Sequence, residues 1–255
     1  MPQQCNCWRT GCWRTCSTSE AKMKIIKNEK LIKRNGNIGK WTTMAALIIL
    51  GIGMYISFTN PKDPRIFTYS MGSLVAGFIL TQVSMYMGNR WGRSPRPDES
   101  LDAGLKGLPG DYSVYHFLTP AAHLLVGPAG IWALIPYRLR GEVIYAKKRW
   151  RVSKGGALQA YMSMFGQDGI GRPDLEAESE IAAVKKLLAK SLDENEIPEV
   201  QAALVFLNEQ AEVQADGAPI PAMRLKQLKD FLRQKAKEKP ISQVELAAVK
   251  AALPK

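Results

Sequence analysis

The prediction of the fold depends on the stretch AAHLLVGPAGIWALIP, residues 121–136. Two short apolar runs, 123–126 and 131–135, flank the segment Gly127-Pro128-Ala129-Gly130. Proline in the second position and glycine in the fourth favour a tight turn, so the stretch predicts a β-hairpin. Neither run alternates between apolar and polar residues, so we expect both faces of each strand to be buried, as in a sheet covered by helices.

The sequence around this hairpin predicts a mixed sheet with flanking helices, an α/β fold. Helix 242–252 has the clearest start, because Ser242 and Glu245 form a capping-box pattern. The other strands are expected at residues 112–118, 142–146, 149–152, 200–207 and 223–225, and the other helices at 98–108, 173–190 and 226–237.

Two long uncharged runs, residues 41–58 and 66–87, precede this domain. At about 1.5 Å per residue they would extend about 27 and 33 Å as helices, and a bilayer core is about 30 Å thick. They predict a transmembrane helical hairpin, with Gly72, Ser73, Ala76 and Gly77 of the second helix packing on Gly51 and Gly53 of the first. A buried helical hairpin of a soluble protein is the alternative.

The basic residues of the chain gather around these two runs. The net charge is +12, with 14 Lys+Arg and 3 Asp+Glu in residues 1–97 but 21 and 20 in residues 98–255. Seven basic residues lie between Lys22 and Lys40, whereas the turn between the runs has only Lys62 and Arg65. The positive-inside rule then places both termini in the cytoplasm. We expect an integral protein of a prokaryotic plasma membrane.

These patterns divide the chain into four parts. They are a disordered basic tail (1–40), the transmembrane hairpin (41–88), a linker (89–97) and a cytoplasmic α/β domain (98–255). All four cysteines lie in the tail, with the spacing C-x-C-x4-C-x3-C. A zinc site is one interpretation, but the spacing fits no common finger and no histidine is near, so we favour a disordered segment without metal.

The central block resembles the nuclease-related (NERD) domain, a family with a restriction-endonuclease-like fold, and the resemblance covers roughly residues 98–255. His123, Gly127, Pro128 and Gly130 match the family pattern of Ile-Asp-His, apolar residues and Gly-Pro. In that family an Asp precedes the His, and the second strand ends in Glu-x-Lys. The resemblance also implies a glutamate on the first helix, near Asp98 or Glu99 here.

The catalytic positions of that motif are degenerate in this chain. Ala122 stands at the Asp position, Ile135 at the Glu position and Tyr137 at the Lys position. Mg²⁺ needs oxygen ligands, and neither Ala nor Ile offers one. The sequence therefore predicts no catalytic residues, no metal and no cofactor. An enzyme with displaced carboxylates, and with Mg²⁺, is the alternative; its candidates are Glu142, Asp168, Asp174 and Glu176.

A basic region follows the hairpin and is the candidate contact for phosphate groups. It is interpreted either as a phosphate-binding face, for nucleic acid or for anionic lipid headgroups, or as a solvated strand face, and anionic lipid is the contact that we predict. Its residues are Arg138, Arg140, Lys147, Lys148, Arg149 and Arg151. His116, on a strand with apolar neighbours, is expected to be structural.

Three functions follow from these patterns. The first is a membrane-anchored, nuclease-like domain without catalysis that acts as a binding or scaffolding module. The second is the metal-dependent nuclease with displaced carboxylates. The third is an accessory subunit of a membrane protein complex. We expect the membrane, anionic lipid headgroups or a protein as partners, and not nucleic acid.

Overall fold

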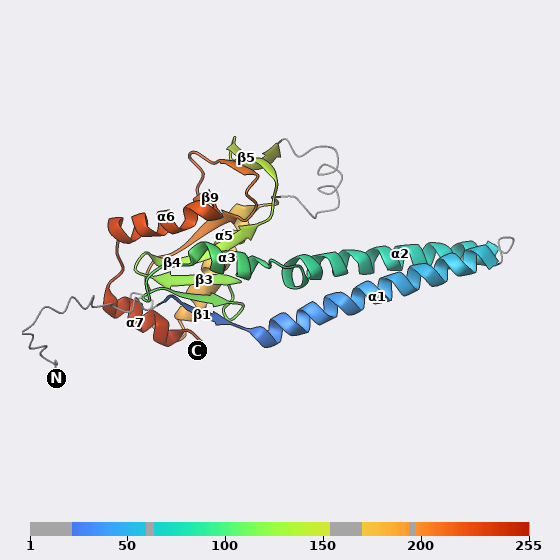
Figure 1. Cartoon of the computed structure of the whole chain (residues 1–255), viewed down its shortest axis with the longest axis horizontal. Coiled ribbons are helices and arrows are strands. Elements are labelled where there is room, and N and C mark those ends of the chain that lie inside the picture. The colour runs from blue at the N-terminus through green and yellow to red at the C-terminus, as the bar shows by residue number, and fades with distance from the viewer. Residues whose placement is uncertain (1–21, 60–63, 154–169, 194–196, 255) are drawn as a thin grey trace, which may run out of the picture.

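The computed structural model describes residues 22–59, 64–153, 170–193 and 197–254. Figure 1 shows two long helices that project side by side from an α/β domain. The domain contains a six-stranded mixed sheet in the order β1-β2-β3-β4-β7-β9 and a three-stranded sheet in the order β6-β5-β8. The predicted α/β class with flanking helices is therefore confirmed.

The predicted central hairpin is formed by β3 (His123–Gly127) and β4 (Gly130–Tyr137). The strands are antiparallel, and Gly127 pairs with Gly130 at the turn. Gly130 has φ +101°, a conformation that glycine adopts without strain. All five residues of β3 are buried, as their continuous apolar pattern predicts.

The other strands of the large sheet pair around this hairpin. Strand β2 (Ser113–His116) is antiparallel to β3, and β7 (Val200–Phe206) is parallel to β4. The short β9 (Ala222–Arg224) is parallel to β7 and closes one edge. A connection between parallel neighbours needs a long crossover, which helix α5 supplies between β4 and β7.

Helices cover both faces of this sheet, which is why its central strands are apolar throughout. Buried residues of α3 (Pro97–Leu105) and α6 (Leu225–Glu238) share one core with Leu125 and Leu134. Buried residues of α5 (Pro173–Leu188) and α7 (Gln243–Ala252) share the other with Leu124 and Ile135. The Ser242 hydroxyl accepts a hydrogen bond from the Glu245 backbone at 3.1 Å, as the capping box predicts.

The predicted hairpin after residue 140 is also present, but in the smaller sheet. Strands β5 (Gly141–Ala146) and β6 (Arg149–Ser153) turn at Lys147 and Lys148, which both have positive φ. The third strand of that sheet, β8 (Ala211–Gln214), pairs in parallel with β5. We did not predict β8, because its four residues lack the apolar content of a core strand.

The largest correction concerns the predicted disordered tail. Residues Lys24–Lys27 form strand β1, which pairs in parallel with β2 at the edge of the large sheet. Helix α1 then runs over Glu29–Thr59, so it begins twelve residues before the predicted start at 41. Strand β1 completes the backbone hydrogen bonds of β2, and this long-range pairing outweighs the basic composition. Residues 1–21, with the cysteines, lie outside the described residues.

Helix α1 packs against α2 (Pro64–Met87), and we call the two the helix pair. Both are long and apolar enough to cross a membrane, by length and composition. Their apolar side chains face outward: Trp41 is 75% exposed and Phe58 81%. Only 11% and 6% of the two apolar windows are buried, which disfavours the buried soluble hairpin.

Small residues let the two helices of the pair approach closely, and the prediction of which residues do so was correct for some of them. A Cβ at Gly53 would overlap the Ser73 side chain, and a Cβ at Gly77 would overlap Leu50. The prediction was wrong for Gly51 and Gly72, which have no described atom within 4 Å of such a Cβ. These two glycines point away from the partner helix.

The predicted linker 89–97 is more ordered than its proline and glycine content suggests. Residues Gly88–Gly92 form one π-helical turn, η1, that continues from α2. Within it, Trp91 is buried against Phe117, with ring centroids 4.2 Å apart. The Glu99 side chain then accepts a hydrogen bond from the Arg96 backbone at 2.9 Å, which caps α3. The helix pair is therefore packed against the domain at its base.

Candidate functional site

A buried ionic cluster joins β1 to α3 beside this base. Lys27 forms ion pairs with Asp98 (3.1 Å) and with Asp102, while Arg96 Nε contacts the other oxygen of Asp98 at 3.0 Å. The Asp98 side chain is fully buried. Burial raises the pKa of its carboxyl, but hydrogen bonds from Arg96 and Lys27 outweigh burial and hold that pKa below its usual range.

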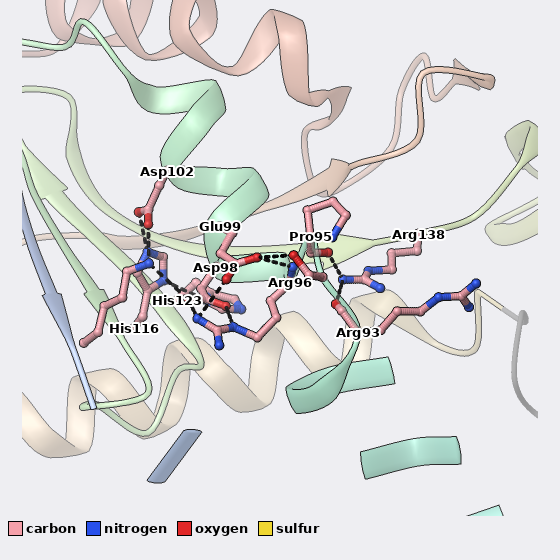
Figure 2. Close-up of polar contacts among 11 residues, drawn as sticks. Arg93, Pro95, Arg96, Asp98, Glu99, Asp102, His116, His123 and Arg138 are labelled. Atoms are coloured by element: carbon pink, nitrogen blue, oxygen red, sulfur yellow. Dashed lines mark hydrogen bonds and ion pairs between the residues drawn. The ribbon is translucent and has the colours of Figure 1, made fainter. Parts of the chain in front are cut away.

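Two histidines extend this cluster across the sheet (Figure 2). Asp102 Oδ1 lies 2.9 Å from His116 Nε2, and His116 Nδ1 lies 2.7 Å from His123 Nδ1. The Asp102 carboxylate can only accept, so His116 donates from Nε2. In the bond between the two Nδ1 atoms, one ring donates and the other accepts. Burial, and then the nearby His116, lower the pKa of His123 well below its ordinary value, which keeps this ring neutral.

His123 also lines a cavity of about 390 Å³ at the base of the helix pair. That volume lies within the range of about 300–1,000 Å³ that is usual for small-molecule sites. One wall comes from α2 and η1, and the other comes from the ends of β3 and β4 and from α5. The lining residues are Gln82, Tyr86, Asn89, Arg90, Pro97, Ala122, His123, Ile135, Pro136, Arg138, Glu176 and Glu180.

The acidic part of this cavity comes from α5, where Glu176 and Glu180 lie one turn apart. Glu176 accepts a hydrogen bond of 2.6 Å from the Tyr137 hydroxyl. Burial, the hydrogen bond to Glu176 and its negative charge all raise the pKa of Tyr137, so the phenol stays protonated. Burial and the negative charge of Glu176 raise the pKa of Glu180 to about 7.

Glu180 is also incompletely paired. Its carboxylate has a hydrogen bond with the Ala122 backbone, but its Oε2 atom is buried without a hydrogen-bond partner among the residues that the structure describes. A buried carboxylate oxygen in this state costs free energy unless a cation, a donor or a proton satisfies it. The cavity therefore offers an unsatisfied acceptor.

The basic part of the cavity comes from Arg90 and Arg138. Arg90 donates to the Tyr86 hydroxyl at 3.3 Å, and its guanidinium lies 5.7 Å from the centre of the Trp91 ring. Arg138 donates from Nη2 to the backbone oxygens of Arg93, at 3.3 Å, and Pro95 (Figure 2). Burial, and then the charge of Arg93, lower the pKa of Arg138.

The structure places the three degenerate motif positions together at this cavity. Ala122 and Ile135 line it, and Tyr137 reaches it through Glu176. No group of three or more His, Cys, Asp or Glu residues that could hold a metal ion occurs in the described part of the chain.

The displaced carboxylates of the alternative hypothesis do not gather at one place. Glu176 lines the cavity, but Glu142 lies on β5 and accepts a hydrogen bond from Gln214 at 2.6 Å. Asp174 accepts one from the indole of Trp150 at 2.9 Å. Asp168 lies outside the described residues. The alternative of an enzyme that uses one of these displaced carboxylates stays a prediction.

The predicted basic region also divides. Arg138 is half-buried at the cavity, whereas the other residues are exposed around the β5–β6 hairpin, namely Arg140, Lys147, Lys148, Arg149 and Arg151. In Figure 1, β5 lies on the side of the domain above the helix pair. The contact of these exposed residues with anionic lipid stays a prediction.

Several residues of the site were not predicted from the sequence. Lys27 belonged to a run of basic residues with no sign of a partner, and Arg90 was assigned to the linker. Glu180 had one local signal, because it follows Glu176 by one helical turn and shares its face. His116 is buried, and its bond to His123 has no local signal in the sequence.

Comparisons with known proteins add no family to this description. No family model matches the chain, and no curated protein and no solved structure matches it either.

Proposed function

We propose that this chain is a membrane-anchored, nuclease-like domain without hydrolytic activity that acts as a binding module on the cytoplasmic face of a prokaryotic plasma membrane. In this proposal the domain is a degenerate member of the NERD family with a restriction-endonuclease-like fold. The helix pair is its transmembrane hairpin, and the cavity at the base of that pair is its binding site.

The position of the cavity is the observation that carries this proposal. Ala122 and Ile135, which replace the acidic residues of the family motif, face the end of α2 across the cavity. They offer no ligand for a metal that would activate water. A wall made of a membrane helix leaves room for a small polar group beside these positions, but it obstructs the approach of a nucleic acid duplex.

Strand β1 supports the proposed topology independently of charge counts. It lies before the first apolar helix, α3 lies after the second, and the two are joined by the Lys27–Asp98 ion pair. Both ends of the helix pair must therefore lie on one side of any membrane that it crosses. The excess of Lys and Arg at those ends favours the cytoplasmic side.

Cysteine labelling tests this topology. In a chain without its native cysteines, Asp63→Cys should react with a membrane-impermeant maleimide added to intact cells, and Ser100→Cys should react only after lysis. Reaction of Ser100→Cys in intact cells would contradict the proposed orientation.

A nuclease assay tests the absence of hydrolysis. Purified full-length protein should not cleave single- or double-stranded DNA or RNA in Mg²⁺ or Mn²⁺, because one positioned catalytic group is typically worth about 2–4 kcal/mol of barrier and three are replaced. Cleavage that copurifies with the protein, and that Glu176→Ala or Glu180→Ala abolishes, would refute the proposal.

The same two glutamates favour one alternative function. Glu176 and Glu180 line one cavity, and a carboxyl with a pKa near 7 can exchange a proton at neutral pH. A hydrolase of another substrate class is therefore the second candidate. Metal-dependent turnover of a small phosphate ester that is lost in Glu180→Gln, but not in Glu178→Gln, would establish it.

A further inference from the structure

The depth of the cavity in the membrane follows from the packing of the helix pair. Gly39 lies against Met87, and Thr43 shares a hydrogen bond with Ser84. Lys40, the last charged residue before the apolar part of α1, is therefore level with the segment 84–87 of α2. If the helix pair crosses a membrane as proposed, this level marks the boundary between the hydrocarbon core and the headgroups.

The α2 and η1 wall of the cavity crosses this level. It extends from Gln82 to Arg90, which is about 12 Å along a helix. The headgroup layer on each side of a bilayer is about 5–8 Å thick. Gln82 therefore reaches the edge of the hydrocarbon, Tyr86 lies at the boundary, and Arg90 lies in the headgroup layer. The cavity opens where lipid headgroups are found.

The charges of the cavity are separated across it. Glu176 and Glu180 on α5 form the acidic wall, and Arg90 on η1 belongs to the basic wall. Arg90 is close enough to lower the pKa of Glu180 by its charge, yet no ion pair joins them in the described part of the chain. The space between the walls suits a ligand that carries one charge of each sign.

The two walls differ in what they require of such a ligand. Glu180 Oε2 is buried and lacks a partner among the described residues, and an N–H donor with a positive charge satisfies this wall best when the carboxyl is ionised. Arg90 offers guanidinium donors, which suit a phosphate. A primary ammonium with a nearby phosphate meets both requirements. A trimethylammonium has no N–H to donate, and an anionic headgroup such as that of phosphatidylglycerol has no cation for the glutamates.

We propose that this cavity binds the headgroup of an ethanolamine phospholipid, with the phosphate at Arg90 and the ammonium at Glu176 and Glu180. The proposal rests on the proposed membrane-anchored binding module and names its ligand class. The rest of the lipid stays in the bilayer, against the exposed apolar surface of the helix pair. The protein thereby recognises a headgroup in the leaflet in which it is anchored.

Lipid retention by the full-length protein tests this proposal. The protein is reconstituted in nanodiscs with equal anionic lipid content and with either phosphatidylethanolamine or phosphatidylcholine as the remainder. The protein is released from the nanodiscs in the mass spectrometer, and native mass spectrometry then counts the lipids that stay bound to it. One phosphatidylethanolamine should remain bound per chain, and phosphatidylcholine should be retained about tenfold less or weaker still, because a charge-assisted hydrogen bond is lost.

Charge-neutral variants identify the site. Glu180→Gln and Arg90→Gln should each reduce retention of phosphatidylethanolamine by about tenfold or more. Two exposed residues supply the matched controls. Glu178→Gln removes an exposed carboxylate on α5, the helix of Glu180, and Arg34→Gln removes an exposed cation on α1, before Lys40. Both controls should retain the lipid as the wild type does. Tryptophan fluorescence of each variant checks that it is folded.

Three results would overturn the proposal. The first is equal retention of phosphatidylethanolamine and phosphatidylcholine by the wild type, and the second is equal retention by Glu180→Gln and Glu178→Gln. The third is binding of soluble phosphoethanolamine to the detergent-purified protein with no specific retention of the lipid, which would assign the cavity to a soluble ligand. None of these results depends on the nuclease assay, so failure of this inference is distinguishable from failure of the proposed function.

Discussion

Glu180 should make the domain less stable as the pH rises, because the surroundings of its carboxyl favour the protonated form. Burial and the charge of Glu176 raise the pKa of its carboxyl from 4.5 to about 7 in the folded protein. The unfolded chain releases this proton near pH 4.5, so between pH 4.5 and 7 the folded state holds the extra proton. Stability relative to a neutral side chain therefore falls as the pH rises through this window, and the loss is complete above pH 7.

The size of the effect follows from the same pKa difference. Each unit corresponds to about 1.4 kcal/mol, so the upper limit for a difference of about 2.5 units is about 3.5 kcal/mol. The carboxyl keeps some access to solvent, which reduces the expected value to about 2 kcal/mol. Glu180→Gln keeps the shape of the side chain and removes the charge. At pH 8 it should raise the melting temperature by about 4–8 °C, and at pH 4.5 it should leave that temperature nearly unchanged.

Thermal unfolding of the full-length protein in detergent, followed by tryptophan fluorescence at half-unit steps from pH 4.5 to 8.5, measures this difference. Glu178→Gln is the control, because its carboxylate is exposed on the same helix and should give a pH-independent difference. A pH-independent difference for Glu180→Gln would refute the reasoning. So would a wild type that gains stability over the variant as the pH rises.

Two further substitutions test the packing of the helix pair and of β1. Lys27→Met removes one of the two cations that pair with the buried Asp98, and chemical denaturation should show a loss of about 2–3 kcal/mol, while Lys24→Met on the same strand should cost less than about 0.5 kcal/mol. Gly53→Leu places a side chain where the two helices touch and should lower the melting temperature in detergent, whereas Gly51→Leu faces open space and should not. If β1 did not pair with β2, Lys27→Met and Lys24→Met would lose the same free energy of unfolding. If the helices did not pack as described, Gly53→Leu and Gly51→Leu would have the same melting temperature.

Local patterns in the sequence were sufficient for the elements whose partners are close along the chain. The β3–β4 hairpin was predicted because its turn and both apolar runs lie within sixteen residues. The start of α7 was predicted because Ser242 and Glu245 are one turn apart. The two long apolar helices follow from composition alone, since length and absence of charge decide them. In each case the energetic reason is local or compositional.

The register of distant segments was decided only by the tertiary structure. Strand β1 has four residues, two of them lysines, and its pairing with β2 crosses the whole helix pair. No local pattern distinguishes it from a basic tail, because its stabilisation comes from backbone bonds and an ion pair with residues far along the chain. The prediction of a domain that begins at residue 98 failed for this reason.

The composition of the candidate site was likewise beyond the sequence. The resemblance drew attention to Ala122, Ile135 and Tyr137, and the structure places them beside one cavity. The sequence did not show that the end of α2 forms the opposite wall, or that the Oε2 atom of Glu180 is buried without a partner among the described residues. The sequence specifies which types of residue are present. Which of them share a cavity depends on how the sheet, α5 and the helix pair pack together, because burial and charge separation arise only from that packing.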